Sequence, residues 1–550
     1  MEIGTRGRLA VWLGMLAILL VAAAIRLPPL PTKDISFADE GSHLQEGRLL
    51  ASLGAAALNG VGLAWPVGGD PAFAPVPRLE WPTRWGPLRG EPLLSVRPGH
   101  SALVGLAMLL AGERPLAGQL ASALLGVATV AMVFAIGRRL YGPPAGLLAA
   151  GALALSGWHA LYSTQALSEV DSLFFAALSL WLYLGAHRHR LLWTGLALGA
   201  AFLTNPRLWI LAPFPLLADW LCRRAAPSGR LPQWGSYTGG FLAPLALAAA
   251  VDELSIFIAG TSLFGNYLHA TFSTVAMHVQ YLVGSSDLGT TAVVPRASLP
   301  ERLSIYPYLT WAWDGVLLTG LTALGLFSAL WHRRPTDRLM LLLFAGAFLG
   351  QTFLTPTAAR FFLMLALPAA LLVGRSLLWL PASRRHLGAA VLLALLTVEG
   401  IPRAASLASV SSGYRGAAAF VVQESGGKHL SNQPSITGFY TGQANARWLS
   451  EDLEAVQRDV AEGYYLAVVA LRPGLSAAAP WGERPEVQQL LPIARVPNPY
   501  GDTLQNLVEA ITIPLSHRLN ARPHSSGAEI LVYDLRPLLA PPSPPLQPDR

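Results

Sequence analysis

The sequence has little of two things that soluble proteins contain in quantity, cysteine and charge. Its 550 residues include one cysteine, Cys222, which excludes an intramolecular disulfide and a zinc cluster built on cysteines. Only 13% of the residues are charged, 53% are hydrophobic, and the mean hydropathy is +0.43. A composition this apolar excludes an ordinary soluble protein of several domains and indicates a polytopic membrane protein.

The basic residues do not form the stripe that a nucleic-acid partner would require. The net charge is +7 and the pI is near 9.7, but the arginines and lysines lie in small groups between apolar runs. Short loops rich in Lys and Arg stay on the cytoplasmic side of a membrane. Membrane topology therefore explains the charge, and we expect no nucleic-acid partner.

Eleven apolar runs come near the length of about 20 residues that a spanning helix needs. The predicted spans are 9–27, 116–136, 144–160, 168–186, 191–205, 208–222, 237–252, 314–331, 339–355, 361–380 and 387–402. The first run could be a cleaved signal peptide, but the many later runs favour a retained span. The shorter run 101–112 is interpreted as an interfacial or re-entrant helix.

Groups of basic residues occur in every second predicted loop and so indicate how the chain is oriented in the membrane. All six groups fall on the side of the N-terminus, which is therefore predicted to be cytoplasmic: Arg6/Arg8, Arg138/Arg139, Arg188/Arg190, Arg223/Arg224, Arg333/Arg334 and Arg384/Arg385. The opposite, outer side receives a first loop (about 27–115), a long loop (about 253–313) and everything after about residue 403. The chain is predicted to be a multi-pass protein of the cell membrane.

The C-terminal part has a different character from the membrane part, 1–403. A helix is predicted over 450–463 with Ser450 as its N-cap, strands over 464–471 and 529–535, and a weaker strand over 429–433. Helices interleaved with strands predict a small extracytoplasmic α/β domain over 404–538. The remainder, 539–550, is a proline-rich tail without a core of its own.

Two adjacent carboxylates lie in the first outer loop, in the stretch "SFADEGSH" (36–43). A carboxylate such as Asp39 can take a proton from an acceptor hydroxyl. Its neighbour Glu40 can raise the pKa of Asp39, hold a substrate hydroxyl or help to bind a divalent cation. The alternative is a solvated loop whose acids have no special role.

A second acidic pair, Glu169 and Asp171, lies at the outer mouth of a predicted span, in "YSTQALSEVDSLFF" (162–175). Ionisable groups there usually face the bundle interior or a wet cavity. Two residues apart on a helix differ by about 200°, so the two acids cannot share one direction. We expect Glu169 to line the cavity, the alternative being an interfacial end cap.

Three arginines lie on the outer side, against the usual cytoplasmic bias: Arg26, Arg207 and Arg360. A planar guanidinium can bind a phosphate in two-point fashion. Snorkelling toward lipid headgroups is the alternative. The histidines His43, His269 and His278 have no metal-ligand spacing, so the metal stays unknown and a divalent cation remains an open option.

Several stretches resemble the GT-C membrane glycosyltransferases, especially the branch of protein O-mannosyltransferases and aminoarabinose transferases. "ADEGSH" (38–43) is similar to the acidic motif of that family's first outer loop, and 162–175 to its second acidic motif. The stretch 117–157 is similar to its second and third spans with the basic-glycine turn between them, and "ARFFLMLALPAALLVG" (359–374) to a late span. The matches share their order and a common side of the membrane.

The resemblance implies a GT-C fold and transfer of a sugar from a polyprenyl-phosphate carrier to a hydroxyl acceptor, which could be a protein, a lipid or a glycan. It makes Asp39 the general base, Glu40 a residue that positions or polarises the acceptor or a metal, and Glu169 the second acid. Arg360 matches the arginine expected at the lipid phosphate. The further candidates for substrate contact are His43, Asp171, Arg26 and Arg207.

Two other functions remain open from the sequence. A transporter or flippase of lipid-linked sugars would favour acids deep within spans and a repeat that relates two halves. A non-catalytic membrane anchor would only display the C-terminal domain. The acids at the outer edges of spans favour the transferase.

Overall fold

The structure is a computed structural model that describes residues 5–36, 38–60, 97–222, 230–259, 267–283, 299–354, 359–450, 452–470, 489–499 and 528–539. Within these residues it divides into two compact units. The first, called the membrane unit, contains residues up to Lys33, 46–60 and 97–410. The second, called the C-terminal unit, contains 34–45 and the described residues from Ser411 onward.

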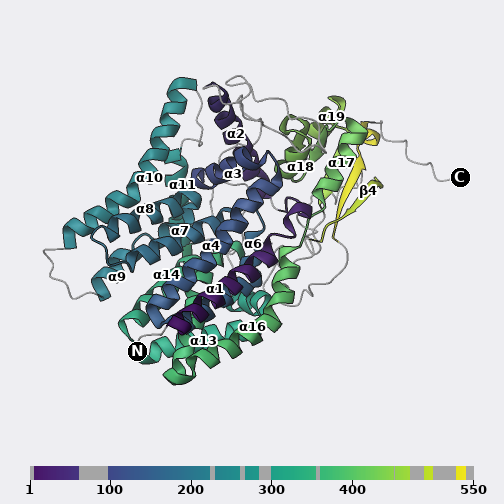
Figure 1. The fold of residues 1–550 in the computed structure, drawn as a ribbon. Coiled ribbons are helices and arrows are strands. Elements are labelled where there is room, and N and C mark those ends of the chain that lie inside the picture. Colours follow the sequence, from purple (N-terminus) through teal and green to yellow (C-terminus); the bar gives the residue numbers. More distant parts are fainter. Residues whose placement is uncertain are drawn as a thin grey trace. The chain divides into compact units, whose positions relative to one another are not determined.

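The elements of the membrane unit that the structure describes are helices and short helical turns, and Figure 1 labels most of the helices. The α-helices are α1 (Thr5–Arg26), α3 (Pro98–Ala111), α4 (Pro115–Tyr141), α5 (Pro143–Leu155), α6 (Gly157–Ser163), α7 (Ser168–Tyr183), α8 (Arg190–Thr204), α9 (Phe214–Cys222), α10 (Arg230–Ala259), α11 (Tyr267–Val283), α12 (Leu299–Leu309), α13 (Val316–His332), α14 (Pro335–Leu354), α15 (Ala366–Ser376) and α16 (Arg385–Ala408). Short 3₁₀ or π turns are η1 (Leu30–Thr32), η2 (Pro206–Leu211), η4 (Thr310–Asp314), η5 (Ala359–Leu365), η6 (Leu377–Trp379) and η7 (Ala382–Arg384). Helix α2 (Ala38–Gly60) belongs to both units.

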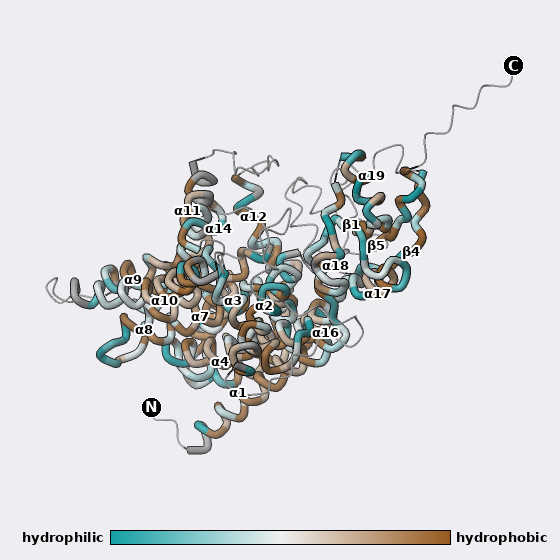
Figure 2. The backbone as a smooth tube through the Cα atoms, turned by 90° about the horizontal axis from the view of Figure 1, so that it is seen from above, coloured by the Kyte–Doolittle hydropathy of each residue, from teal (hydrophilic) through white to brown (hydrophobic). Residues whose placement is uncertain are grey.

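Several of these helices begin at a proline, at residues 98, 115, 143 and 335. Proline suits the first helical position because its missing N–H would have no partner there. Helices α4, α7, α8 and α10 lie side by side in chain order (Figure 1). Figure 2 shows hydrophobic residues along α1, α8 and α10, as expected for helices that face lipid.

Five helical segments of the described chain are long and apolar enough to cross a membrane, and a bent pair makes six. They are Gly7–Thr32, Pro115–Tyr141, Pro335–Leu354, Arg360–Trp379 and Ala382–Ala408, with the bent pair Pro143–Leu155 and Gly157–Ser163. The chain is thus a multi-pass membrane protein, while the count of eleven spans stays a prediction. Three further apolar helices, α3, α8 and α13, are shorter than a full span.

Two of the expected continuous spans are broken in the structure. The predicted span 144–160 bends by 60° between α5 and α6, and the predicted span 208–222 is divided between η2 and α9. At the first break, Asp314 accepts hydrogen bonds from the Ser156 hydroxyl (2.8 Å) and the Trp158 N–H (3.1 Å). A carboxylate far away in the sequence thus satisfies a backbone group that the break would leave without a partner.

The long loop expected at about 253–313 is also more helical than predicted. Its described residues form the end of α10, then α11, α12 and the π turn η4. Gly315, with φ +93°, ends this turn, and a Cβ there would lie 2.2 Å from Glu399 Oε1. That carboxylate accepts the N–H groups of Val316 and Leu317, so it caps the start of α13.

A buried ion pair joins three late helices of the membrane unit. Arg375 of α15 donates two hydrogen bonds to Asp337 of α14, at 2.6 and 3.0 Å, and both side chains are fully buried. The same guanidinium donates to Ser328 of α13 at 2.7 Å. A bidentate pair with a further hydrogen bond compensates the desolvation of two charges in an apolar bundle.

The C-terminal unit contains a five-stranded sheet in the order β2-β1-β3-β5-β4. The strands are β1 (His429–Ser431), β2 (Ala446–Trp448), β3 (Leu466–Ala470), β4 (Pro492–Pro497) and β5 (Glu529–Asp534). Strand β1 pairs in parallel with β2 and β3, whereas β5 is antiparallel to β3 and β4. A strand with proline at both ends, as β4 has, suits the edge that it occupies.

Three helices accompany this sheet: α17 (Tyr414–Ser425), α18 (Pro434–Thr441) and α19 (Leu453–Ala461). Strands β1, β3 and β5 lie within the segments predicted as strands, whereas β2 and β4 were not predicted. The expected N-cap of the helix near 450–463 was wrong. Asp452 is the cap, because its carboxylate accepts the Glu454 N–H, and Ser450 instead accepts the Asp452 N–H.

Candidate functional site

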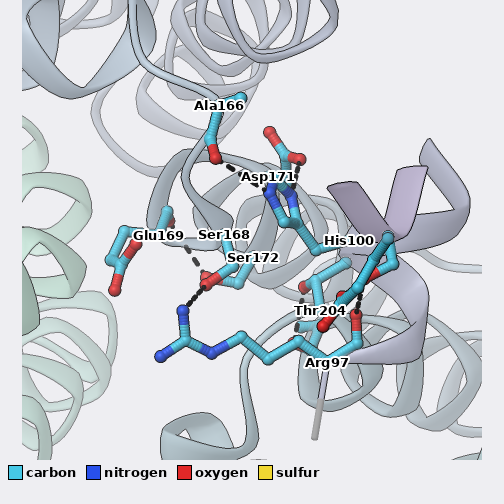
Figure 3. A network of polar contacts seen from close by, with 11 residues as sticks. Arg97, His100, Ala166, Ser168, Glu169, Asp171, Ser172 and Thr204 are labelled. Carbon is cyan, nitrogen blue, oxygen red and sulfur yellow. Dashed lines mark hydrogen bonds and ion pairs between the residues drawn. The ribbon is translucent and has the colours of Figure 1, made fainter. Parts of the chain in front are cut away.

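The second acidic motif forms a sharp turn in the membrane unit. Helix α6 ends at Ser163, and α7 begins at Ser168, with Glu169 and Asp171 in its first turn. Negative side chains are favourable at a helix N-terminus because the exposed N–H groups carry partial positive charge. Figure 3 shows the two carboxylates pointing in different directions from α7, in agreement with the expected separation.

Glu169 faces two arginines from elements far away in the sequence. Its Oε1 lies 4.0 Å from Arg207 Nη1 and 4.0 Å from Arg360 Nε, and the glutamate is only 4% exposed. Arg207 belongs to η2, where Asn205 Oδ1 accepts the Arg207 N–H at 3.2 Å and so fixes the start of the turn. Arg360 belongs to η5. The structure therefore brings together three of the residues that the sequence singled out.

An aromatic ring holds the two guanidinium groups of this cluster. The guanidinium carbon of Arg207 lies 3.6 Å from the centroid of the Phe361 ring, and that of Arg360 lies 5.0 Å from it. Cation–π contacts of this kind orient a guanidinium while leaving its N–H edges able to donate hydrogen bonds. We call Glu169, Arg207, Arg360 and Phe361 the arginine cluster.

Asp171 has a different partner, His100 of α3. The Asp171 carboxylate lies 2.7 Å from His100 Nδ1, and the other ring nitrogen lies 3.2 Å from the Ala166 carbonyl oxygen. Both side chains are fully buried. Each ring nitrogen of His100 therefore faces an oxygen acceptor, one from the carboxylate and one from the backbone. This pair ties α3 to the turn that presents Glu169 (Figure 3).

The contact between Asp171 and a substrate stays a prediction, and in the structure the carboxylate pairs with a buried histidine. Sequence reasoning missed His100 and its neighbour Arg97, whose Nη1 donates to Ser168 Oγ at 3.1 Å. Figure 3 shows the guanidinium of Arg97 reaching toward Ser168. A usable signal was present, since "RPGH" (97–100) places two ionisable residues at the start of an apolar helix.

Arg26 contacts the chain near a helix break, and its role in substrate binding stays a prediction. It is fully buried, and its guanidinium contacts the Ala154 carbonyl oxygen at 3.0 Å and His159 Nδ1 at 2.9 Å. It lies beside the end of α5, where the chain breaks before α6. Carbonyl groups near a helix break need donors inside a membrane, and Arg26 supplies one.

The first acidic motif was predicted to lie in a loop. In the structure it lies at the start of a helix. Asp39 and Glu40 occupy the first turn of α2, in the C-terminal unit. Glu40 is fully buried, and its Oε2 accepts the Ser36 N–H at 2.7 Å. A glutamate in the first turn that reaches back to a preceding N–H follows the logic of the capping box. Asp39 is partly exposed and His43 is buried.

Residues just before this motif are anchored within the same unit. The Ile35 N–H donates to the Tyr440 hydroxyl at 3.1 Å, and the Ser412 hydroxyl donates to the Ile35 carbonyl oxygen at 2.5 Å. Asp34 Oδ1 lies 3.7 Å from Arg415 Nε. Burial raises the pKa of the Asp34 carboxyl, and Arg415 opposes this shift.

Helix α2 approaches α18 closely at Gly41 of the motif. A Cβ at this position would lie 2.7 Å from the Ser435 carbonyl oxygen and 2.9 Å from the Ile436 nitrogen. The Gln45 amide also donates to that Ser435 oxygen, at 2.7 Å. The glycine of "ADEGSH" therefore allows α2 to pack closely against α18. The motif and the C-terminal helices form one folded unit.

No cluster of three metal-ligating side chains occurs among the residues that the structure describes. His269 is exposed on α11, while the side chain of His278 lies outside the described residues. The structure therefore provides no observation that would assign a metal.

The fold and these residues define a class of protein, a multi-pass membrane protein with the GT-C fold. The structure resembles that of ArnT from Cupriavidus metallidurans bound to undecaprenyl phosphate, with a TM-score of 0.56, 14% identity, and coverage of 96% of this chain and 99% of that one. It also resembles the oligosaccharyltransferase AglB from Archaeoglobus fulgidus in complex with an inhibitory peptide and a dolichol-phosphate, with a TM-score of 0.52, 11% identity, and coverage of 84% and 69%.

Within this class the chain resembles the branch that contains the protein mannosyltransferases. The model of the family described as dolichyl-phosphate-mannose-protein mannosyltransferase matches residues 92–251, the segment that contains His100, Glu169, Asp171 and Arg207. No curated protein sequence gives a match. The resemblance to GT-C glycosyltransferases that was expected from short motifs is confirmed.

Proposed function

We propose that the protein is an integral membrane glycosyltransferase that moves a sugar from a polyprenyl-phosphate carrier to a hydroxyl acceptor on the outer face of the membrane. The observation that carries the proposal is the arginine cluster, where two guanidinium groups from η2 and η5 converge on Glu169. The GT-C fold and the family match over residues 92–251 support the same reaction class.

Arg207 and Arg360 are proposed to bind the phosphate of the carrier. Both are largely buried, and a guanidinium in a water-poor site holds a phosphate more strongly than one in bulk solvent. Glu169 then orients the two guanidinium groups before the donor arrives. The related ArnT and AglB structures contain undecaprenyl phosphate and dolichol-phosphate, which supports a polyprenyl phosphate as the ligand.

In the proposed reaction, the acceptor hydroxyl oxygen attacks the anomeric carbon of the donor sugar. The bond from that carbon to the phosphate oxygen breaks, and the polyprenyl phosphate leaves with the electron pair. The proton of the hydroxyl passes to Asp39, which acts as general base. The arginines stabilise the charge that develops on the leaving phosphate. The assignment of Asp39 rests on the motif "ADEGSH", and Glu40 supports the start of α2.

A transfer assay on the Glu169→Gln variant tests the arginine cluster. Glutamine keeps the size of the side chain but removes the charge that faces both arginines, so the guanidinium groups lose their orientation. We expect transfer from a polyprenyl-phosphate sugar to fall by about 100-fold, in line with loss of one preorganised charged contact. The matched control is Glu253→Gln, an exposed glutamate of α10 in the same unit, which should transfer normally.

Measurements of thermal unfolding and of hydrogen exchange serve as the control that the Glu169→Gln protein is folded. Transfer at the wild-type rate by folded Glu169→Gln protein would remove the arginine cluster from the proposed mechanism.

A further inference from the structure

A second polar site lies in the membrane unit, at the end of α7 opposite to Glu169. It is a cavity of about 500 Å³ between the ends of α4 and α7 and the starts of α8 and α10. Its lining includes Arg139, His187, Arg188, His189 and Arg190. Leu184, at this cavity, follows Glu169 by fifteen positions, or about 22 Å along α7, so the cavity is distinct from the arginine cluster.

The charge of this cavity suits an anion. Of its five ionisable lining residues, three are arginines and two are histidines, and none is acidic. Arg190 is paired with Asp219 at 3.2 Å. Within the described part of the chain, Arg139 and Arg188 have no ion-pair partner, and both are exposed. Two guanidinium groups are thus available to one ligand.

The backbone of the cavity adds a second, independent feature. Leu191 and Leu192, in the first turn of α8, also line it. The N-cap residue His189 makes no side-chain hydrogen bond to this turn. The first N–H groups of a helix lack partners inside the helix and carry partial positive charge, so an anion is stabilised there. The side chains and the helix start therefore favour the same kind of ligand.

Exposed tryptophans place the cavity at the depth of lipid headgroups. Trp181 in the last turn of α7 is 40% exposed, and Trp193 in the first turn of α8 is 51% exposed. Tryptophan gathers at the interface between the hydrocarbon region and water. Phospholipid headgroups are the anions present at that depth, and basic pockets between spanning helices are known to bind them.

We propose that this cavity binds the phosphate group of an anionic phospholipid from the adjacent leaflet. Basic residues that only set the membrane topology need not line a common cavity. The basic residues here line one cavity together with the first turn of α8. The proposal is independent of the sugar transfer and concerns the opposite end of α7. A phospholipid headgroup and free inorganic phosphate both carry a phosphate anion, so free phosphate is the alternative ligand for this cavity.

The test compares lipid binding by the full-length wild-type protein, Arg139→Gln/Arg188→Gln and a control, Arg333→Gln/Arg334→Gln. The control removes the same number of exposed arginines from the turn between α13 and α14. Each protein is delipidated and titrated with phosphatidylglycerol or phosphatidylcholine, and bound lipid is counted by native mass spectrometry. A parallel titration uses inorganic phosphate and follows thermal unfolding.

We expect the wild type and the control to bind phosphatidylglycerol in preference to phosphatidylcholine. The cavity variant should bind phosphatidylglycerol at least tenfold more weakly, since each basic residue near anionic lipid contributes about 1 kcal/mol. Equal binding by the cavity variant, or an equal loss in the control, would overturn the site. Stabilisation by inorganic phosphate without any preference for phosphatidylglycerol would overturn the lipid as its occupant.

Discussion

At the scale of single residues, buried ionisable side chains in this protein mostly hold segments of chain together. Arg375 joins three helices, Arg26 supplies a donor near a helix break, and Glu40 caps the start of α2. The arginine cluster differs, because its two guanidinium groups face the carboxylate at 4.0 Å and share an aromatic ring. That looser geometry suits groups that must also bind a ligand.

His429 in the C-terminal unit gives a prediction about pH. It is fully buried, its Nδ1 donates to the Gly427 carbonyl oxygen at 2.8 Å, and burial lowers its pKa from 6.5 to about 4. The unfolded chain therefore binds a proton more readily than the folded one. The stability that comes from the neutral imidazole is complete above pH 6.5 and is lost as the pH falls toward 4, by about 2 kcal/mol at pH 5.

Hydrogen exchange of peptides from the C-terminal unit at pH 7 and pH 5, corrected for the intrinsic exchange rate, measures this loss. His429→Asn keeps an N–H donor but does not titrate in this range, so its loss between the two pH values should be about 2 kcal/mol smaller. Asp34 has a raised pKa and works in the opposite sense, but it is unchanged between the two proteins. The exposed His386 supplies the control His386→Asn. An identical pH dependence in His429→Asn and wild type would refute the burial effect.

Sequence reasoning found the acidic residues of the site better than their partners. Because residues two apart on a helix differ in direction by about 200°, Glu169 and Asp171 were predicted to face different ways. The structure gives them different neighbours. The motif "RPGH" could have singled out His100, but its pairing with Asp171 joins residues 71 positions apart, and no local pattern encodes such a pair. The contacts of Arg26 with Ala154 and His159 were beyond prediction for the same reason, since these residues lie more than 120 positions away.

At the scale of elements, the contact between α2 and α18 is the feature most open to test. Gly41→Ala would place a Cβ 2.7 Å from the Ser435 carbonyl oxygen, so one helix must shift. We expect the C-terminal unit to lose about 1–3 kcal/mol of stability. Thermal unfolding and hydrogen exchange of α18 measure the effect.

Gly416→Ala in α17 is the matched control in the same unit. A Cβ there would meet only Val496 Cγ1, at 3.4 Å, and alanine favours a helix over glycine by up to about 1 kcal/mol. This variant should be as stable as the wild type or more so. If Gly41→Ala behaves like Gly416→Ala, the close approach of the two helices is wrong.

Element boundaries followed the sequence where local signals were strong and failed where distant groups intervened. Prolines marked the starts of α3, α4, α5 and α14. The break between α5 and α6 depends on Asp314, which lies more than 150 positions further along the chain. Strand β2 was missed because it has only three residues. Strand β4 was missed because it lies at a sheet edge, where its residues alternate between partly buried and exposed.

At the scale of the whole molecule, composition alone placed the chain in a membrane, and the helices agree with that class. The number of spans was harder to predict, because several helices of the bundle are short or broken, and a hydropathy pattern counts apolar residues without seeing such breaks. The fold resemblance extends over 96% of the chain. The choice of sugar and acceptor depends on contacts that no local motif encodes.

The most direct measurement presents the purified full-length protein with a panel of polyprenyl-phosphate sugars, together with peptide, lipid and glycan hydroxyl acceptors, and follows the loss of each donor by mass spectrometry. The proposed function predicts that the wild type consumes at least one donor and releases polyprenyl phosphate. Folded Asp39→Asn protein should consume none, because it lacks the base. Consumption of no donor by folded wild-type protein, or equal consumption by Asp39→Asn, would contradict the proposed transfer with Asp39 as its base.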